Sequence, residues 1–594
     1  MFKKTAYLIV VLASIMSQSH ANPIDEKAFV ATDFIVLHNN DMHARFEQTN
    51  VNSGTCTASD AQSNKCYGGF ARVANQVRKY RQEAKEGGSP VLYLNAGDTY
   101  TGTPWFAVFK DNISAAFLNK LQPDAISLGN HEFDENIQGL VPFLKNVEFP
   151  VLTCNLDLTK VPELSAAEHL MNSTILKVNG TKVGVIGYLT PDTKFLIKTN
   201  PLEFKDEIES INEEAGKLKA KGVNIIIALG HSGYQRDQEI AAKCPEVDVV
   251  IGGHSHTFLY SGAVPNAERS EGPYPTVVKQ TGGKEVPVVQ AYAYTKYLGK
   301  LHLQFDKAGN LIEFDGTPIL LDASVPRESD VLDLLEVYRS NITDLEKSIV
   351  GHTKVQLEGR KVACRSTECN LGNLITESMI YARVVEDQGG AFWTDAPIAI
   401  MNSGAIRAGI EKRSDGSITQ NDILTVLPFK NALYVIPISG ARLRSTLELS
   451  ATKRTKDSNG GFLQFSGIHV TYDYRNEEGK RVKSAEVRCG ECDVPVYVPL
   501  DDTKTYKIIT TEFLKDGGDQ HDLVANGTTP ITMKWAQDEA LIEYLKHRDY
   551  VYPELDGRIV VIESTDSSAT TISSSFIWLY LTSSTLIYVV HSFQ

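Results

Sequence analysis

Short apolar runs alternate with longer amphipathic stretches over the first half of the chain. Six runs between Asp33 and Asp306 have the length and composition of buried strands: 34–37, 91–94, 125–128, 183–186, 224–229 and 247–251. Amphipathic stretches at 70–85 and 206–220 separate some of them and are typical of helices with one buried face. Buried strands separated by helices predict an α/β layered domain.

The pattern changes after this region. Residues 288–305 alternate apolar and polar positions, as in an antiparallel strand, and 330–347 predicts one helix with an apolar face. That face consists of Val331, Leu334, Leu335, Tyr338 and Ile342. No strand precedes this helix, so we interpret it as a connector to a second domain of mixed strands and helices. We therefore predict a first domain at 22–327, a linker helix at 328–348 and a second domain at 349–563.

Composition agrees with a multidomain globular protein. A chain of 594 residues is too long for one hydrophobic core, and 42% hydrophobic with 22% charged residues is ordinary for a soluble fold. The net charge of −14 argues against nucleic acid or an acidic membrane surface as a partner. It does not exclude a phosphorylated substrate, because a bound metal can make a site locally positive.

The N-terminus has the order of a secretory signal peptide. Lys3 and Lys4 precede the apolar run 6–15, and Ser19-His-Ala21 ends in small residues. We predict a signal peptide over residues 1–21.

The C-terminus predicts a GPI-anchor signal over 564–594 that is removed from the mature protein. Small residues at 564–569 are followed by a polar spacer at 570–575 and an apolar tail at 576–590. The alternative is a transmembrane helix, but fifteen residues fall short of the ~20 needed to span a bilayer. We expect the mature protein on the extracellular face of the plasma membrane, anchored by lipid and also shed or secreted.

Eight cysteines fit an oxidising compartment. Three close pairs predict short-loop disulfides: Cys56/Cys66, Cys364/Cys369 and Cys489/Cys492. The pairing of Cys154 and Cys244 stays open. Acceptor sequons for N-linked glycan begin at Asn112, Asn172, Asn179, Asn341 and Asn526.

Polar residues with metal-binding chemistry follow five of the predicted strands. They are Asp41 and His43, Asp98, Asn130 with His131 and Asp134, His231, and His254 with His256. Ligands in open α/β sheets bind outside the carboxyl ends of the strands, so these ends are expected to converge on one site. Imidazole, carboxylate and amide ligands without thiolate suit zinc, manganese or another divalent ion.

These motifs resemble the five signatures of the two-metal calcineurin-like phosphoesterases. Their order and surroundings are similar to the 5'-nucleotidase branch, near animal ecto-5'-nucleotidases and arthropod apyrases. The resemblance implies a four-layer α/β/β/α metallophosphoesterase domain, joined by the helix to a mixed α/β nucleotide-binding domain. It also implies two divalent ions, zinc foremost, with manganese, cobalt and magnesium as other candidates. Asp41, His43 and His256 would hold one ion, Asn130, His231 and His254 the other, and Asp98 would bridge them. His131 and Asp134 resemble the catalytic dyad.

In the second domain the resemblance implies a nucleotide site. Phe429 and Phe513 would sandwich the base, Asn402 would touch it, and Asp519 would accept from the ribose hydroxyls. Three arginines would hold phosphate oxygens: Arg365, Arg407 and, from the first domain, Arg45. Family similarity also implies domain closure around the nucleotide and a homodimer through the second domain.

We therefore predict an extracellular 5'-nucleotidase that hydrolyses AMP to adenosine and phosphate. The alternative within the family is an apyrase that removes phosphate from ATP and ADP. An alternative of another class, a catalytically inactive surface binding protein, would need a broken ligand set, whereas every ligand position is present here.

Overall fold

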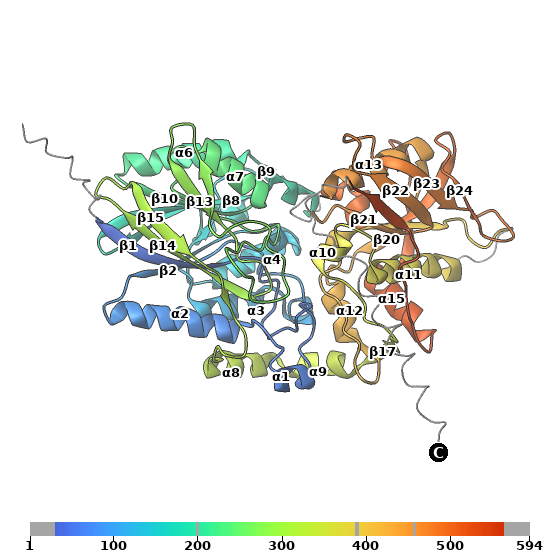
Figure 1. The fold of residues 1–594 in the computed structure, drawn as a ribbon, viewed down its shortest axis with the longest axis horizontal. Coiled ribbons are helices and arrows are strands. Elements are labelled where there is room, and N and C mark those ends of the chain that lie inside the picture. The colour runs from blue at the N-terminus through green and yellow to red at the C-terminus, as the bar shows by residue number, and fades with distance from the viewer. Residues whose placement is uncertain (1–29, 198–200, 387–390, 455–458, 564–594) are drawn as a thin grey trace, which may run out of the picture.

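The computed structural model describes residues 30–197, 201–386, 391–454 and 459–563, which form two lobes side by side (Figure 1). The predicted signal peptide and anchor signal lie outside the described residues. Within the described part of the chain, no helix is long and apolar enough to cross a membrane.

The first lobe contains two sheets rather than one. An eight-stranded sheet has the order β15-β14-β1-β2-β3-β4-β6, with β16 paired to β14. Its strands are β1 (Thr32–Asn39), β2 (Val91–Asn95), β3 (Ala125–Ser127), β4 (Val151–Leu152), β6 (Leu170–Met171), β14 (Tyr297–Phe305), β15 (Leu311–Gly316) and β16 (Ile319–Leu320). β1, β2 and β3 run parallel, whereas β14 is antiparallel to β1, as the alternating pattern at its end of the sequence predicts.

The second sheet has six strands in the order β12-β13-β11-β10-β8-β7. They are β7 (Ser173–Val178), β8 (Thr181–Leu189), β10 (Ile225–His231), β11 (Val249–Ile251), β12 (Thr276–Lys279) and β13 (Glu285–Val289). A short pair, β5 (Leu156–Asp157) and β9 (Glu203–Phe204), lies apart. The six predicted strands are confirmed, but they divide between the two sheets.

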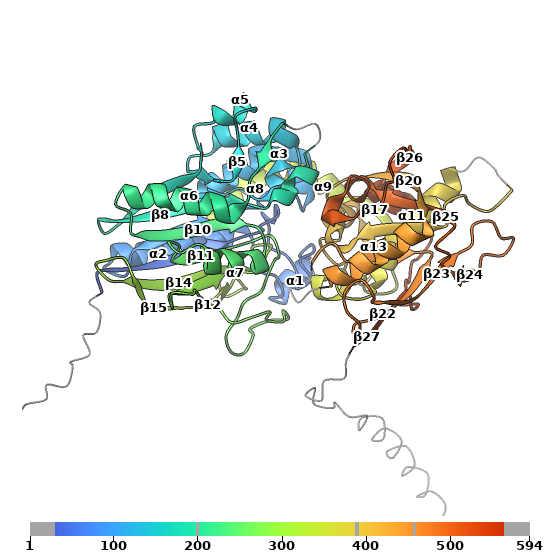
Figure 2. The same cartoon turned by 90° about the horizontal axis from the view of Figure 1, so that it is seen from above.

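Helices cover the outer faces and complete four layers. α2 (Phe70–Lys85), α3 (Pro104–Leu121) and α4 (Asn136–Asn146) pack on the first sheet, while α6 (Glu207–Ala220) and α7 (Tyr234–Lys243) pack on the second (Figures 1 and 2). Aliphatic side chains from both sheets form one core between them, including Val36, Leu94, Val185 and Ile227. The short helices of this lobe are α1 (Ala58–Gln62), α5 (Pro162–Ser165), η1 (Asn130–Phe133) and η2 (Pro191–Phe195). The predicted four-layer α/β/β/α domain is confirmed.

Two helices, not one, connect the lobes. α8 (Ser329–Tyr338) and α9 (Ser340–Lys347) meet at Arg339, whose N–H bonds to the Glu336 carbonyl in a tightened turn. The predicted apolar face is present, since Val331, Leu335 and Ile342 are buried.

The second lobe is built on a five-stranded sheet with the order β21-β18-β25-β20-β26. Its strands are β18 (Ile398–Asn402), β20 (Ala432–Ser439), β21 (Leu463–Ser466), β25 (Thr505–Thr511) and β26 (Ile531–Ala536). Helices α11 (Asn370–Glu386), α12 (Gln420–Val426) and α15 (Gln537–Lys546) share one core with it, and α13 (Gly440–Lys453) shares another.

Smaller elements complete this lobe. A four-stranded sheet contains β22 (Ile468–Asp473), β23 (Val482–Arg488), β24 (Tyr497–Pro499) and β27 (Ile559–Ile562), and β17 (Ile349–His352) pairs with β19 (Ser417–Thr419). The short helices are α10 (Lys361–Cys364), α14 (Glu512–Lys515), η3 (Ser403–Ala405) and η4 (Gly518–Gln520).

The three predicted disulfides are present, closing loops between Cys56 and Cys66, Cys364 and Cys369, and Cys489 and Cys492. Cys154 and Cys244, whose pairing the sequence leaves open, are not bonded to each other; both are free and buried.

Candidate active site

The carboxyl ends of β1, β2, β10 and β11, together with η1 after β3, bring the predicted ligands to one place. Several ligands stand in the left-handed region of the backbone, with positive φ angles at Asp41 (50°), His43 (47°), Asp98 (59°), His254 (75°) and His256 (53°). Each such residue costs about 1–3 kcal/mol, and clusters of them mark functional sites.

Three ligand atoms form a first group: Oδ1 of Asp41, Nε2 of His43 and Nε2 of His256. The two imidazole nitrogens are 3.1 Å apart, and the His256 nitrogen lies 3.1 Å from the Asp41 oxygen. All three side chains are buried. Ligand atoms around a tetrahedral zinc with bonds of about 2.0–2.1 Å are spaced by roughly this distance. The donor set and its spacing therefore fit a divalent ion.

A second group lies beside the first and consists of Asp41, Asp98 and His231. The His231 Nε2 atom is 2.9 Å from Oδ2 of Asp98. Its Nδ1–H donates to the Ala96 carbonyl at 2.6 Å, which leaves Nε2 directed at the carboxylate. An imidazole nitrogen and a carboxylate oxygen at this spacing are ligand types that a divalent ion takes.

His254 and Asn130 extend this second group. Nδ1 of His254 lies 2.8 Å from Oδ1 of Asn130, so an imidazole and an amide oxygen meet as the resemblance implies. His43 shows the same support as His231, since its Nδ1–H donates to the Thr101 carbonyl at 2.9 Å. Metal-binding histidines commonly hold their second ring nitrogen in this way.

His131 and Asp134 form the predicted pair. Nδ1 of His131 lies 2.9 Å from Oδ2 of Asp134, and Nε2 lies 4.0 Å from Asp98. Burial disfavours the charged ring, but Asp134 and Asp98 outweigh it, so the pKa of His131 is raised. A histidine held this way can present an Nε2–H donor to a bound anion.

Glu132, which lies between the proposed ligand Asn130 and Asp134, holds the Asp98 loop. Its buried carboxylate accepts the backbone N–H groups of Gly129 and Asp98 on one oxygen and those of Thr99 and Tyr100 on the other. The loop also depends on Gly129, because a Cβ there would lie 2.1 Å from Oδ1 of Asp98. These contacts fix the predicted bridging carboxylate.

Side chains of the second lobe reach the same site. The Arg407 guanidinium contacts Nε2 of His43 and lies 5.6 Å from the ring centre of Phe429. Phe429 in turn stacks on His131, with ring centres 5.2 Å apart. Arg365 is buried. The structure thus brings two predicted phosphate-binding arginines and one predicted base-stacking ring to the metal ligands and the dyad.

The other predicted nucleoside contacts gather around Asp519. The Asn402 amide donates to Asp519 at 2.9 Å, and the Phe513 ring packs against Gly518, where a Cβ would lie 2.5 Å from it. From the first lobe, Asp192 accepts from Gln520 at 3.4 Å. The roles of these residues toward a nucleotide stay predictions.

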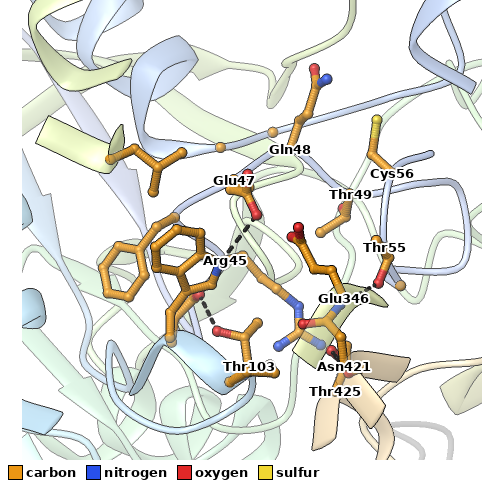
Figure 3. Close-up of a pocket in the computed structure, with 18 of the residues that line it drawn as sticks. Arg45, Glu47, Gln48, Thr49, Thr55, Cys56, Thr103, Glu346, Asn421 and Thr425 are labelled. Atoms are coloured by element: carbon orange, nitrogen blue, oxygen red, sulfur yellow. Dashed lines mark hydrogen bonds between the residues drawn. The ribbon is translucent and has the colours of Figure 1, made fainter. Parts of the chain in front are cut away.

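The Arg45 side chain is hydrogen-bonded to backbone carbonyls of both lobes. Its guanidinium donates to the carbonyls of His43, Ser53, Gly102 and Arg407, and it lies 4.7 Å from the Tyr294 ring centre. It borders a cavity of about 570 Å³ between the lobes, which Glu47, Thr55, Glu346 and Asn421 also line (Figure 3). These bonds tie the His43 segment to the second lobe, and the predicted phosphate contact of Arg45 stays a prediction.

Lys361 is a site neighbour that the sequence does not reveal. From the second lobe, its Nζ donates to the carbonyls of Ser255 (2.7 Å) and His256 (3.1 Å) and pairs with Glu271 at 3.0 Å. A lysine on a short helix has no motif, so only the arrangement of the lobes identifies it.

The chain is similar in sequence and in structure to known proteins. The family model described as calcineurin-like phosphoesterase matches residues 34–258, and the 5'-nucleotidase C-terminal domain matches residues 349–526. Protein 5NUC of Lutzomyia longipalpis is 47% identical over 534 residues, covering 89% of this chain and 93% of that protein. The 5'-nucleotidase of Homo sapiens is 40% identical, covering 89% and 91%. The crystal structure of a 5'-nucleotidase precursor from Thermus thermophilus aligns with a TM-score of 0.79 at 33% identity, covering 89% of this chain and 99% of that one.

Proposed function

Because the chain belongs to the 5'-nucleotidase family of calcineurin-like phosphoesterases, we propose that it hydrolyses nucleoside 5'-monophosphates, releasing adenosine and phosphate from AMP. It is a metal-dependent phosphoric monoester hydrolase. The substrate proposal rests on one observation: side chains of the second lobe contact the proposed metal ligands and the dyad of the first lobe. Arg407 and Phe429 of the second lobe contact the ligand His43 and the dyad member His131 of the first.

We assign the seven ligand residues to two divalent ions, and zinc fits their nitrogen-rich donor set. Asp41, His43 and His256 would hold one ion. Asn130, His231 and His254 would hold the other, with the buried Asp98 carboxylate shared between them. When bound, two such ions supply a hydroxide nucleophile near neutral pH and clamp the phosphate during in-line attack.

The chain's own residues position the reacting groups. Asp134 holds Nδ1 of His131, which leaves Nε2–H free to donate to a phosphoryl oxygen as negative charge develops there. Arg365 and Arg407 offer planar donor sets that match phosphate oxygens. Phe429 and Phe513 are proposed to stack on the base, which tolerates different bases, and Asp519 to accept from ribose hydroxyls.

Release of inorganic phosphate from AMP, ADP and ATP, measured in parallel with zinc present, tests the substrate. We expect turnover of AMP; release from ATP and ADP but not from AMP would identify an apyrase instead. No release from any nucleotide, together with no bound divalent ion, would support a binding protein.

We also propose that the enzyme works outside the cell, held by a GPI anchor. The three disulfides and the solvent exposure of all five sequon asparagines support an extracellular protein. Release of activity from intact cells by a phosphatidylinositol-specific phospholipase tests the anchor. Light scattering on the purified protein tests the homodimer that family similarity implies.

A further inference from the structure

The loop Gly252–Thr257 carries two of the proposed metal ligands. It follows β11 and presents His254 and His256, both with positive φ angles. Each of these residues would lower its free energy by relaxing to an ordinary backbone conformation. Contacts from outside the loop must fix it.

Gln290 makes these contacts from the next strand. It directly follows β13, which runs parallel to β11, so its fully buried side chain lies beside the loop. The Gln290 Oε1 atom accepts the Thr257 N–H at 3.0 Å and the Ser255 hydroxyl at 3.2 Å. Its Nε2 donates to the Gly253 carbonyl at 3.0 Å. One amide therefore bonds on both sides of His254 and His256.

Asp237 fixes which way this amide points. Its Oδ2 accepts from Nε2 of Gln290 at 2.7 Å, and its Oδ1 accepts from the Tyr188 hydroxyl at 2.7 Å. Asp237 lies on α7 and is fully buried. It also packs against the start of the loop, since a Cβ at Gly252 would lie 1.8 Å from Oδ2. A reversed amide would set its oxygen against the carboxylate and the Gly253 carbonyl.

We propose that Gln290 is a positioning residue that holds His254 and His256 in metal-binding geometry, with Asp237 and Tyr188 orienting its amide. The proposal rests on the assignment of these histidines as metal ligands. Because they belong to different proposed ions, a loosened loop weakens both sites. Residues that orient metal ligands typically contribute about 10–100-fold in metal affinity.

Zinc affinity, measured by competition with a chromogenic chelator, tests this without reference to turnover. Gln290→Glu keeps the shape but sets a carboxylate oxygen against Asp237 and the Gly253 carbonyl. We expect at least a tenfold loss of zinc affinity. Gln280→Glu is the matched control, because Gln280 is a buried glutamine in the same sheet region whose amide donates to the carbonyls of Ala241 and Cys244, away from the loop. Its zinc affinity should stay within about twofold of the unaltered chain.

A second variant covers a failure of Gln290→Glu to fold. Gln290→Met keeps the length of the side chain but removes its hydrogen bonds to Gly253, Ser255 and Thr257, and should also weaken zinc binding by about tenfold. Gln290→Glu combined with Asp237→Asn gives the introduced carboxylate a donor and should recover part of the loss. Unchanged zinc affinity in folded Gln290→Glu, or in Gln290→Met where the first does not fold, overturns the proposal. Absence of zinc binding in the unaltered chain would instead overturn the ligand assignment itself.

Discussion

Five of the seven proposed ligands stand in backbone conformations that ordinary residues avoid, and this strain must be offset by fixed contacts. Buried polar side chains supply them: Glu132 holds the Asp98 loop, and Gln290 holds the His254 loop. Asn40 adds a third such contact by donating to Oδ2 of Asp41 at 2.7 Å. At the residue scale, buried side chains that make several hydrogen bonds therefore hold the proposed ligands in these conformations.

His131 should be needed for turnover but not for metal binding. Its ring pairs with Asp134 and belongs to neither group of metal-ligand atoms. We expect His131→Ala to lower kcat for AMP by at least a hundredfold, because its donor to the phosphoryl group is lost. Zinc content, measured by atomic emission, should stay near that of the unaltered protein. Parallel loss of zinc and activity would show that His131 serves the metal site instead.

Glu132 should contribute to stability through the Asp98 loop. Glu132→Gln replaces one accepting oxygen by a donor that faces backbone N–H groups. Leaving buried donors unsatisfied costs about 1–3 kcal/mol, so the free energy of unfolding in urea should fall by about this amount. Glu135→Gln, three residues along and partly exposed, is the control and should change it by less than about 0.5 kcal/mol. Equal effects of the two substitutions would contradict this role.

Residue types alone reveal the ligands but not their supports. Burying Asp, Asn or His without a partner costs free energy, so these residues directly after apolar runs indicate a site. Asp41, Asp98 and His231 can therefore be predicted from the sequence. Gln290 and Lys361 are ordinary polar residues with no motif, and their contacts lie far away in the chain. Only the folded arrangement identifies them.

At the element scale, the strands can be predicted because an apolar run is a feature of neighbouring residues. The division of these strands into two sheets depends on pairing between residues far apart in the sequence. The six runs do not indicate which strands pair, so β1 and β10 look alike in sequence yet belong to different sheets. Arg339, between α8 and α9, keeps helical φ and ψ angles of −58° and −39°, and its contacts are with the first lobe: its guanidinium bonds to Glu47 and lies over Trp105.

The disulfide between Cys364 and Cys369 closes the loop that carries Arg365. Gln464 supports the same loop, donating to the carbonyls of Cys364 (2.8 Å) and Thr367 (2.7 Å) and accepting from the Cys369 N–H. Replacing both cysteines by serine should free Arg365 and raise KM for AMP by about tenfold, as one phosphate contact is worth about 1.5–3 kcal/mol.

The disulfide between Cys489 and Cys492 offers a matched control on another loop of the same lobe. Its double serine variant should leave KM within about twofold. An equal rise in KM in both variants would mean that the disulfides act through overall stability. Zinc content should be unchanged in both, because neither loop holds a proposed ligand.

At the scale of the whole molecule, the proposed site is completed where the two lobes meet. Bonds between the lobes surround the site, from Lys361 and Arg407 at the metal ligands to Gln520 at Asp192. The linker helices and the cavity at Arg45 lie on another side of this contact. Composition and hydrophobic pattern carry no information about such an arrangement, because it joins residues more than a hundred positions apart.

Lys361 should stabilise the closed arrangement of the lobes. Ser255, His256 and Glu271, to which its ammonium group bonds, all lie in the first lobe, so these bonds exist only while the lobes are in contact. Lys361→Met keeps the apolar stem but removes the donors, which leaves Glu271 without this partner. We expect a larger radius of gyration by small-angle X-ray scattering with a non-hydrolysable AMP analogue bound, and a rise in KM of about tenfold.

Lys354→Met provides the comparison, because Lys354 is an exposed lysine of the same lobe whose ammonium lies over Tyr550 rather than against the first lobe. It should match the unaltered protein in both measurements. Other contacts between the lobes remain, such as Arg407 with His43 and Gln520 with Asp192, so Lys361→Met should shift the balance between open and closed forms without separating the domains. A radius of gyration unchanged by Lys361→Met, with KM also unchanged, would show that closure does not depend on this lysine.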